Sequence, residues 1–199
     1  MGISLSEFKF KCTKCGACCS SPGLIVNLTP RDLRSIRKFL KVEPEKLLQV
    51  VAFYQIDPNS NDMKSIQEKL VFPGLKTSKG EAYLGLLKRQ DGRCIFLKEN
   101  KCKIYSARPR LCQSYPYTFQ KKGQGASIMI TDFATKMCPG IGTGNNVNVA
   151  KVKELGKIVI ADVDTFFSFA RWWNSRKDDS SDLWSPRRLV TEMIKFSKP

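Results

Sequence analysis

The stretch Cys12-Thr-Lys-Cys15-Gly-Ala-Cys18-Cys19 holds half of the cysteines of this chain within eight residues. The other four stand singly at Cys94, Cys102, Cys112 and Cys138, and the sequence contains no histidine. Thiolates are soft ligands that suit zinc and iron–sulfur clusters, and a turn that carries several of them half-encloses a metal. The sequence therefore predicts a protein organised around metal held by thiolates.

Disulfide pairing is the alternative interpretation of these cysteines. Eight is an even number, and adjacent cysteines such as Cys18-Cys19 occur in disulfide-rich secreted domains. The first residues lack the apolar core of a secretory signal, and no apolar run approaches the roughly 20 residues that a spanning helix needs. We therefore expect a soluble cytoplasmic protein, and in that reducing compartment metal ligation is favoured over disulfides.

The charge of the chain is strongly basic. It carries 34 Lys and Arg against 18 Asp and Glu, a formal charge of +16. A basic surface around a metal centre favours a polyanionic partner, RNA or DNA first and an acidic membrane surface second, and the alternative is a merely solvated surface. The candidate nucleic-acid contacts are the basic residues near the single cysteines: Lys88, Arg89, Arg93, Lys101, Lys103, Arg110, Lys121 and Lys122.

The middle of the chain has the pattern of short strands. Asp91-Gly92 separates residues 83–89 from 94–97 and is typical of a hairpin turn, and Glu99-Asn100-Lys101 predicts a second turn before Cys102. Residues 127–133 predict a further strand. Each of these strands lies close to a cysteine in sequence, so we expect a small antiparallel sheet stapled by metal.

Helices are expected on both sides of this region. Thr29-Pro30 and Ser185-Pro186 are helix starts, each with a capping hydroxyl followed by a first-turn proline. A second helix is expected from about Pro44 to Tyr54, and apolar residues recur at helical spacing beyond Gly144 to about Trp173. The fold class predicted is α+β, with cysteine-rich loops flanked by helices. We divide it into a metal-binding domain, residues 1–144, and a helical C-terminal extension packed on it, residues 145–199.

The spacing of the first cluster favours iron–sulfur chemistry. Cys-x-x-Cys-Gly-x-Cys resembles the ligand runs of bacterial ferredoxins, and Cys138-Pro139 resembles the end of such a run. Zinc sites usually close with a second Cys-x-x-Cys or a histidine pair, and the sequence has neither. Eight thiolates would serve two four-coordinate sites, or one cluster with spare cysteines. Cys19 is expected to point away from its neighbour Cys18.

Three further segments complete an ordered set of motifs: Gly92-Arg-Cys94-Ile-Phe-Leu, Cys102-Lys-Ile-Tyr-Ser-Ala-Arg108-Pro-Arg-Leu-Cys112-Gln-Ser-Tyr-Pro116, and Cys138-Pro-Gly-Ile-Gly142. With the first cluster, they resemble the YkgJ-type cysteine-cluster family (CxxCxxCC), described as zinc- or iron-chelating domains. Gln113 departs from the family, which commonly carries arginine there. Flagellin lysine methylases share the cysteine pattern and are believed to use an iron–sulfur cluster. The resemblance implies metal binding by all eight cysteines and favours an iron–sulfur cluster, 4Fe–4S, over zinc: Cys12, Cys15, Cys18, Cys19, Cys94, Cys102, Cys112 and Cys138.

Arg108 precedes Pro109 just before Cys112. Its guanidinium is a candidate to neutralise the thiolate cluster or to donate hydrogen bonds to sulfur. The alternative is a surface arginine before a turn.

The absence of histidine removes the usual general base near neutral pH, and with it Ser-His-Asp and Cys-His catalysis. We therefore expect a non-catalytic metal-binding module that binds RNA, for example as a ribosome-associated protein. One alternative is an iron–sulfur enzyme, redox or methyl-transferring, similar to the flagellin methylases. The other is a protein for metal storage or delivery.

Overall fold

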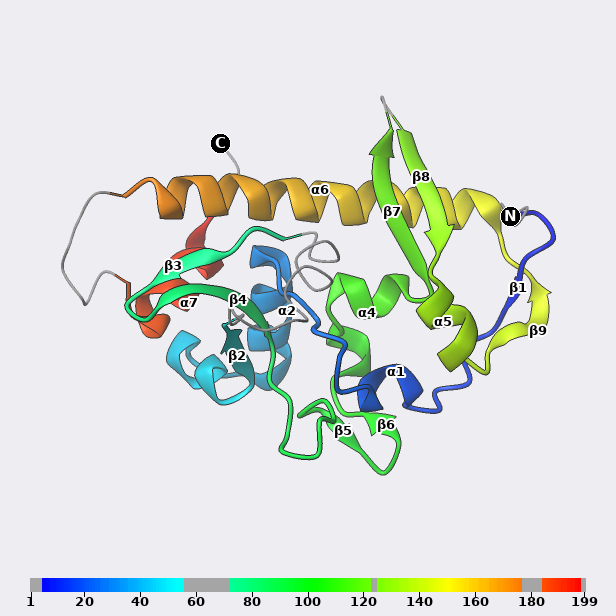
Figure 1. The fold of residues 1–199 in the computed structure, drawn as a ribbon, viewed down its shortest axis with the longest axis horizontal. Coiled ribbons are helices and arrows are strands. Elements are labelled where there is room, and N and C mark those ends of the chain that lie inside the picture. Colours follow the sequence, from blue (N-terminus) through cyan, green and yellow to red (C-terminus); the bar gives the residue numbers. More distant parts are fainter. Residues whose placement is uncertain (1–4, 56–71, 123–124, 177–183, 198–199) are drawn as a thin grey trace, which may run out of the picture.

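The computed structural model describes residues 5–55, 72–122, 125–176 and 184–197, and it has an α+β architecture (Figure 1). Its helices are α1 (Ala17–Ser20), α2 (Pro30–Leu40), α4 (Arg110–Ser114), α5 (Asp132–Met137), α6 (Val149–Asn174) and α7 (Pro186–Lys195), with 3-10 helices η1 (Pro44–Gln49) and η2 (Tyr105–Ala107). Its strands are β1 (Lys9–Phe10), β2 (Val51–Tyr54), β3 (Leu75–Thr77), β4 (Gly80–Leu86), β5 (Leu97–Lys98), β6 (Lys101–Cys102), β7 (Tyr117–Lys122), β8 (Gly125–Ile130) and β9 (Ile141–Asn146).

The strands form several small antiparallel sheets where the sequence predicted one. β4 is the middle strand of the three-stranded sheet β2-β4-β3, and the pairs β1-β9, β5-β6 and β7-β8 each form a two-stranded sheet. The α+β class and the antiparallel pairing of short strands are therefore confirmed. Metal stapling of these sheets stays a prediction.

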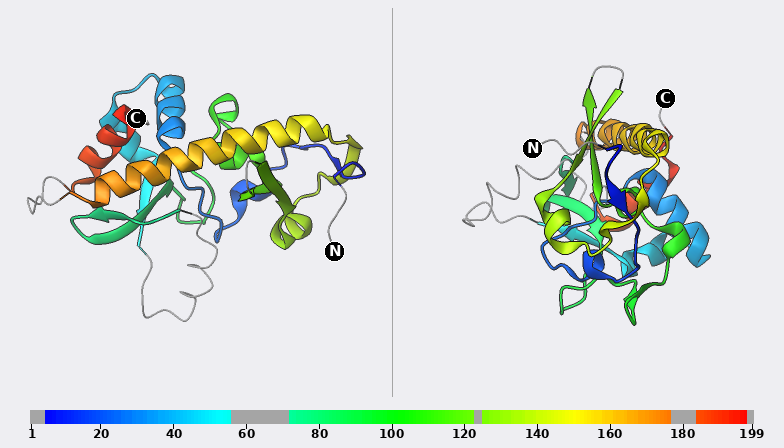
Figure 2. Two further views of the ribbon diagram at one scale, coloured as in Figure 1. Left: turned by 90° about the horizontal axis from the view of Figure 1, so that it is seen from above. Right: turned by 90° about the vertical axis from the view of Figure 1, so that its right-hand side faces the viewer.

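Helix α6 is the long axis of the molecule. It runs along one side in Figure 1, with its first half beside the β7-β8 hairpin and its second half beside α7 and β3, and Figure 2 shows the same helix from above and end-on. Asn148 begins it by accepting the Lys151 N–H at 3.0 Å. At Gly156 a Cβ would lie 2.7 Å from the Phe119 ring, so glycine is needed where the hairpin crosses the helix.

The principal core joins both ends of the chain. Buried residues of α2, such as Leu33, belong to the same apolar cluster as Phe166 and Trp173 of α6 and Leu189 of α7. The indole N–H of Trp173 donates to the Lys76 carbonyl at 2.8 Å, which ties α6 to β3. The C-terminal helices thus pack on the part of the chain before residue 144, and a domain boundary at that position stays a prediction.

Both expected helix starts are confirmed. The Thr29 hydroxyl accepts the Asp32 N–H at 3.3 Å, and the Asp32 carboxylate accepts the Thr29 N–H at 3.0 Å, a reciprocal capping box. Ser185 caps α7 through the Arg188 N–H at 3.3 Å. The helix beyond residue 144 is also confirmed, as α6.

Two predicted elements are wrong in part. The second helix ends at Gln49 as η1, because the β-branched and aromatic run from Val51 to Tyr54 pairs with residues 83–86 of β4 instead. The strand expected over 127–133 ends at Ile130, because the Thr131 hydroxyl accepts the Ala134 N–H at 3.1 Å and begins α5.

The two predicted turns are both present. Gly92 has φ +77° and donates its N–H to the Arg89 carbonyl at 2.9 Å, although the flanking segments share a single bridge, between Lys88 and Cys94. Glu99 and Asn100 both have positive φ between β5 and β6. In the described part of the chain, none of the helices has the length and apolar character needed to span a bilayer.

Candidate metal centre

All eight cysteines line one cavity of about 140 Å³. The fold brings them there from four segments: the first cluster, the Cys94–Cys102 loop with its β5-β6 hairpin, α4, and the end of α5. Among the described residues, no three His, Cys, Asp or Glu side chains lie close enough together to hold one metal ion. The thiols therefore surround a shared space and do not form a closed single-ion cage.

The turn that carries the first cluster rests on the β5-β6 hairpin. Gly16 has φ +77°, and a Cβ there would lie 3.1 Å from Leu97 Cδ1 and 3.4 Å from the Asn100 carbonyl oxygen. The Gly16 carbonyl then accepts the Cys19 N–H at 2.9 Å. Glycine after Cys15 is thus explained by backbone conformation together with close packing.

Four cysteines, which we call the inner wall of the cavity, are buried (Cys94) or half-buried (Cys19, Cys102 and Cys112). The Cys94 N–H donates to the Cys19 carbonyl at 2.8 Å, which joins the first cluster to the middle of the chain. Cys102 lies on β6 opposite Leu97, and α4 carries Cys112. Burial raises the pKa of Cys94, of Cys102 and most strongly of Cys112. Without a cation these thiols stay protonated at neutral pH, so their use as ligands requires metal to displace the protons.

Three cysteines lie nearer the mouth. Cys12 and Cys15 are exposed, and Cys138 is half-buried. The Lys11 N–H donates to the Gly140 carbonyl at 3.1 Å, and a Cβ at Gly140 would collide with the Lys11 carbonyl oxygen, so the two chain segments lie directly side by side. This contact places Cys12 beside the segment that carries Cys138.

Cys18 stands between the two groups. Its sulfur lies 3.9 Å from that of Cys19, so the expectation that the two side chains diverge is wrong. The hydrogen bond between them lowers the pKa of Cys18 to about 7 and raises that of Cys19. The positive charge of Arg108 acts in the same direction on Cys18. Cys18 is therefore the thiol of this pair that ionises first.

Two residues assigned to nucleic-acid contact from sequence have their polar ends at the back of the inner wall. The Lys88 ammonium donates to the Ser21 carbonyl at 2.6 Å, and burial lowers its pKa, while thiolate charge on Cys94 and Cys19 would raise it. The Arg89 guanidinium donates to the Cys94 and Leu97 carbonyls. Sequence reasoning missed this placement because their spacing from Cys94 does not reveal which way the loop turns.

Arg108 lines the cavity, as expected of a residue that supports the thiols. Its guanidinium carbon lies 3.7 Å from the centre of the Tyr105 ring, and its Nε donates to the Tyr105 carbonyl at 3.0 Å. The ammonium of Lys14 lies 4.9 Å from the same ring. These contacts hold two cations beside the thiols, and the role of Arg108 toward bound metal stays a prediction.

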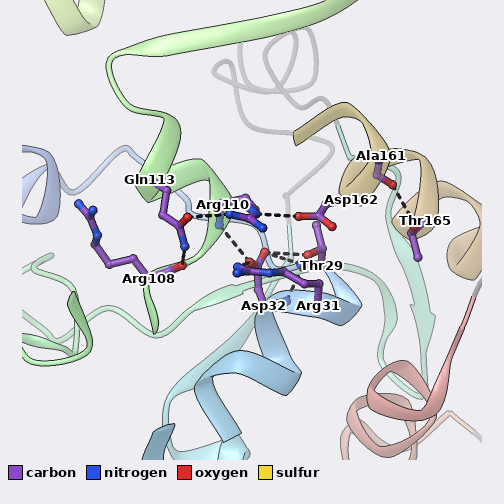
Figure 3. A network of polar contacts seen from close by, with 9 residues as sticks. All are labelled: Thr29, Arg31, Asp32, Arg108, Arg110, Gln113, Ala161, Asp162 and Thr165. Carbon is purple, nitrogen blue, oxygen red and sulfur yellow. Dashed lines mark hydrogen bonds and ion pairs between the residues drawn. The ribbon is translucent and has the colours of Figure 1, made fainter. Parts of the chain in front are cut away.

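A polar network anchors α4, and with it Cys112 (Figure 3). The fully buried Asp32 accepts the Arg110 N–H at 3.0 Å and the Thr29 hydroxyl at 2.8 Å. The Arg110 guanidinium donates to Asp162 on α6 at 3.0 Å and to the Gln113 side chain at 2.8 Å. Arg110, a third residue of the nucleic-acid set, thus has its guanidinium engaged inside the protein. Burial raises the pKa of Asp32 in spite of these donors.

Gln113 occupies the position where the sequence resemblance led us to expect arginine. Its amide donates to the Arg108 carbonyl at 2.5 Å while its oxygen accepts from Arg110. A neutral amide can both donate and accept here, which a guanidinium cannot.

Four of the five remaining basic candidates lie at the surface. Arg93 pairs with Asp91 at 3.6 Å, and Lys121 pairs with Asp164 at 3.4 Å. Lys101 and Lys103 are exposed on either side of Cys102. Lys122 ends β7, and its side chain lies outside the part of the chain that the structure describes.

The sequence analysis assigned no role to one residue that lines the cavity. Tyr115 follows α4 and lines the cavity, and its hydroxyl oxygen is buried without a hydrogen-bond partner among the described residues. Burial raises its pKa to about 12, and charge on Cys138, Cys18 and Cys15 adds to that increase. The available signal was its place in the motif between Cys112 and Pro116.

Comparison of the sequence with known proteins identifies the family to which this chain belongs. Among curated proteins, the uncharacterized protein MJ0661 of Methanocaldococcus jannaschii is 25% identical over 205 residues, which cover 98% of this chain and 88% of that protein. No solved structure matches the chain. The family model CxxCxxCC, described as "Putative zinc- or iron-chelating domain", matches residues 11–139. Because that match spans all eight cysteines and well over half of the chain, this protein belongs to the CxxCxxCC family, whose description supports metal binding.

Proposed function

We propose that this protein holds an iron–sulfur cluster, 4Fe–4S in preference to zinc, on thiolates supplied by its eight cysteines. The observation that carries the proposal is the convergence of all eight on one cavity from four separate segments. The donor set is all sulfur, which suits zinc and iron–sulfur clusters. A bound cluster would supply electron-transfer chemistry to the protein.

The spacing of the thiols supports a cluster over a single ion. In a tetrahedral zinc–thiolate site, bonds of about 2.3 Å put neighbouring sulfurs about 3.8 Å apart. Cys18 and Cys19 are this close, with their sulfurs 3.9 Å apart, but no three described side chains are placed to hold one ion. A multi-iron cluster holds its cysteine sulfurs farther apart, because metal and sulfide fill the space between them.

We also propose that the eight thiols divide into two sets of four, with the Cys18–Cys19 contact of 3.9 Å at the boundary between them. The inner set is Cys19, Cys94, Cys102 and Cys112, linked by the Cys94-to-Cys19 hydrogen bond and by the fold of α4 over the β5-β6 hairpin. The outer set is Cys12, Cys15, Cys18 and Cys138, linked by the contact between Lys11 and Gly140. We propose that each set is one four-thiolate site. Lys88 faces the inner set and Arg108 lies beside both, where their charges offset the thiolates.

Anaerobic purification followed by measurement of iron, zinc and acid-labile sulfide tests this function. Iron and sulfide in equal amounts, near four per chain for one cluster and eight for two, are expected. If zinc is found without acid-labile sulfide, the protein holds structural zinc and no iron–sulfur cluster. Folded wild-type protein with neither metal would contradict the proposal.

We propose a non-catalytic RNA-binding role, as in ribosome association, as the second function of the molecule, together with a cytoplasmic location. It is supported by the charge of +16 and by the exposure of Lys101 and Lys103 beside the metal centre. The alternatives for a cluster protein are a redox or methyl-transferring enzyme and a metal carrier. A carrier would release its metal to a weak chelator, and an enzyme would change redox state during turnover.

The affinity for RNA is expected to fall as the salt concentration rises. If the pair Lys101 and Lys103 neutralises two phosphates, raising the salt from 50 to 200 mM lowers the affinity about tenfold through this pair alone. The double variant Lys101→Gln, Lys103→Gln should lose that part of the salt dependence in a filter-binding titration, whereas Lys153→Gln, Lys157→Gln on the exposed face of α6 should retain it. Equal affinity at both salt concentrations argues against the RNA function.

A further inference from the structure

We propose that the Tyr115 hydroxyl donates a hydrogen bond to the bound metal group, either to a cluster sulfide or to a ligating cysteine sulfur. Tyr115 is then a positioning residue that sets the reduction potential and the retention of the group. This inference rests on the proposed metal-binding function and deepens it.

The first observation is an unpaired polar atom in a place where such atoms are rare. The Tyr115 oxygen is buried, and no donor or acceptor among the described residues reaches it. Its side chain lines the same cavity as the eight cysteines. Buried hydroxyls almost always have a partner, and an unpaired one costs free energy. A bound group in this cavity would supply the missing partner.

Three cysteines lie close enough to Tyr115 for their charge to act on its hydroxyl. The thiols whose charge acts on Tyr115 are Cys138, Cys18 and Cys15, all members of the outer set. They come from the first cluster and from the end of α5, so the phenol lies where these two segments meet. The hydrogen bond from Tyr115 is therefore assigned to the outer site.

Chemical complementarity gives the direction of the hydrogen bond. A tyrosine phenol is protonated near neutral pH and can donate. Thiolate and sulfide sulfurs carry negative charge and can only accept. Hydrogen bonds to the sulfurs are one of the factors that set the potential of an iron–sulfur cluster, and partners around the ligands control metal affinity.

Tyr105 lines the cavity too, but it does not have the same role. It is 38% exposed, and its ring is covered by the Arg108 guanidinium. Its side chain therefore serves as a platform for a cation, whereas the Tyr115 hydroxyl is enclosed.

The test compares Tyr115→Phe with wild type in the full chain, purified without oxygen. The variant keeps the ring and removes only the donor, so the fold is expected to persist. Its midpoint potential should shift to a more negative value, because a hydrogen bond to sulfur favours the reduced, more negative cluster. Its metal affinity, from competition with a chelator, should fall about 10-fold or more. If the bound metal is zinc, which has no redox change, the metal affinity alone tests the proposal.

Tyr117→Phe is the matched control. Tyr117 is also buried, two residues along the chain, but its ring packs on Phe8 and Phe10 in a smaller apolar cluster that includes Val152 of α6, and it does not line the cavity. The potential and affinity of this variant should equal those of wild type.

Three results would overturn the proposal. A metal-loaded wild type and Tyr115→Phe with the same potential and the same affinity would overturn it alone and leave the proposed function in place. A phenolate-to-iron charge-transfer band in wild type, lost in the variant, would make Tyr115 a ligand instead of a donor. A folded wild type without metal would overturn the proposed function and this inference with it.

Discussion

Replacing Cys112 by serine is expected to remove about half of the bound metal and to destabilise the protein severely. Burial raises the pKa of Cys112 well above its ordinary value, and Cys112 lies on α4 and lines the cavity. A structural metal site supplies on the order of 10 kcal/mol of folding free energy. The buried residues Phe96, Leu97 and Ile104 join the segments around the inner set to the principal core, so loss of the metal should also loosen that part of the core.

Metal analysis and chemical denaturation measure the effect. Cys12→Ser is the matched control, because Cys12 is exposed and belongs to the outer set. It should lower the metal content without removing the inner site, and the stability should fall less. The double variant Cys12→Ser, Cys112→Ser should lose the metal of both sites. The double variant Cys94→Ser, Cys112→Ser should lose no more metal than Cys112→Ser alone, because both residues belong to the inner set. If every single variant lost all of the metal, one shared cluster would replace the two proposed sites.

Replacing Asp32 by alanine is expected to destabilise the protein by about 3–4 kcal/mol. The change leaves the Thr29 and Arg110 N–H donors without an acceptor, at about 1–3 kcal/mol each, while the Thr29 hydroxyl still caps α2. The Arg110 N–H begins α4, so metal affinity should fall as well. Asp164→Ala is the control, since its surface pair with Lys121 should contribute less than 1 kcal/mol.

The raised pKa of Asp32 also determines how the stability difference between wild type and Asp32→Ala changes with pH. Burial raises the pKa of Asp32 above its unfolded value, so the folded state binds this proton more tightly than the unfolded state. The stability of wild type relative to Asp32→Ala should therefore increase as the pH falls toward the folded-state pKa. Urea titrations between neutral and mildly acidic pH measure it, and a difference that shrinks on acidification would contradict the assignment.

The secondary structure shows where local rules suffice. Capping residues and proline determine the starts of α2 and α7, and apolar spacing determines α6, because these signals act within one or two turns of helix. The same rules were wrong after Gln49. Residues 51–54 satisfy a helical stripe as well as a strand, and the choice was made by pairing with β4, which lies about 30 residues further along the chain.

By itself, the sequence determined that eight thiols in a known order would be available, that histidine chemistry was absent, and that α2, α6 and α7 would form. These properties depend on residue identity and near neighbours. Only the tertiary structure decided that the thiols line one cavity and that Cys18 and Cys19 lie 3.9 Å apart. It also decided that the charged ends of Lys88, Arg89 and Arg110 are engaged by groups within the protein. The enclosure of the Tyr115 hydroxyl among the cysteines was decided in the same way. Each of these depends on contacts between segments distant in the chain, and residue spacing carries no information about the direction from which they meet.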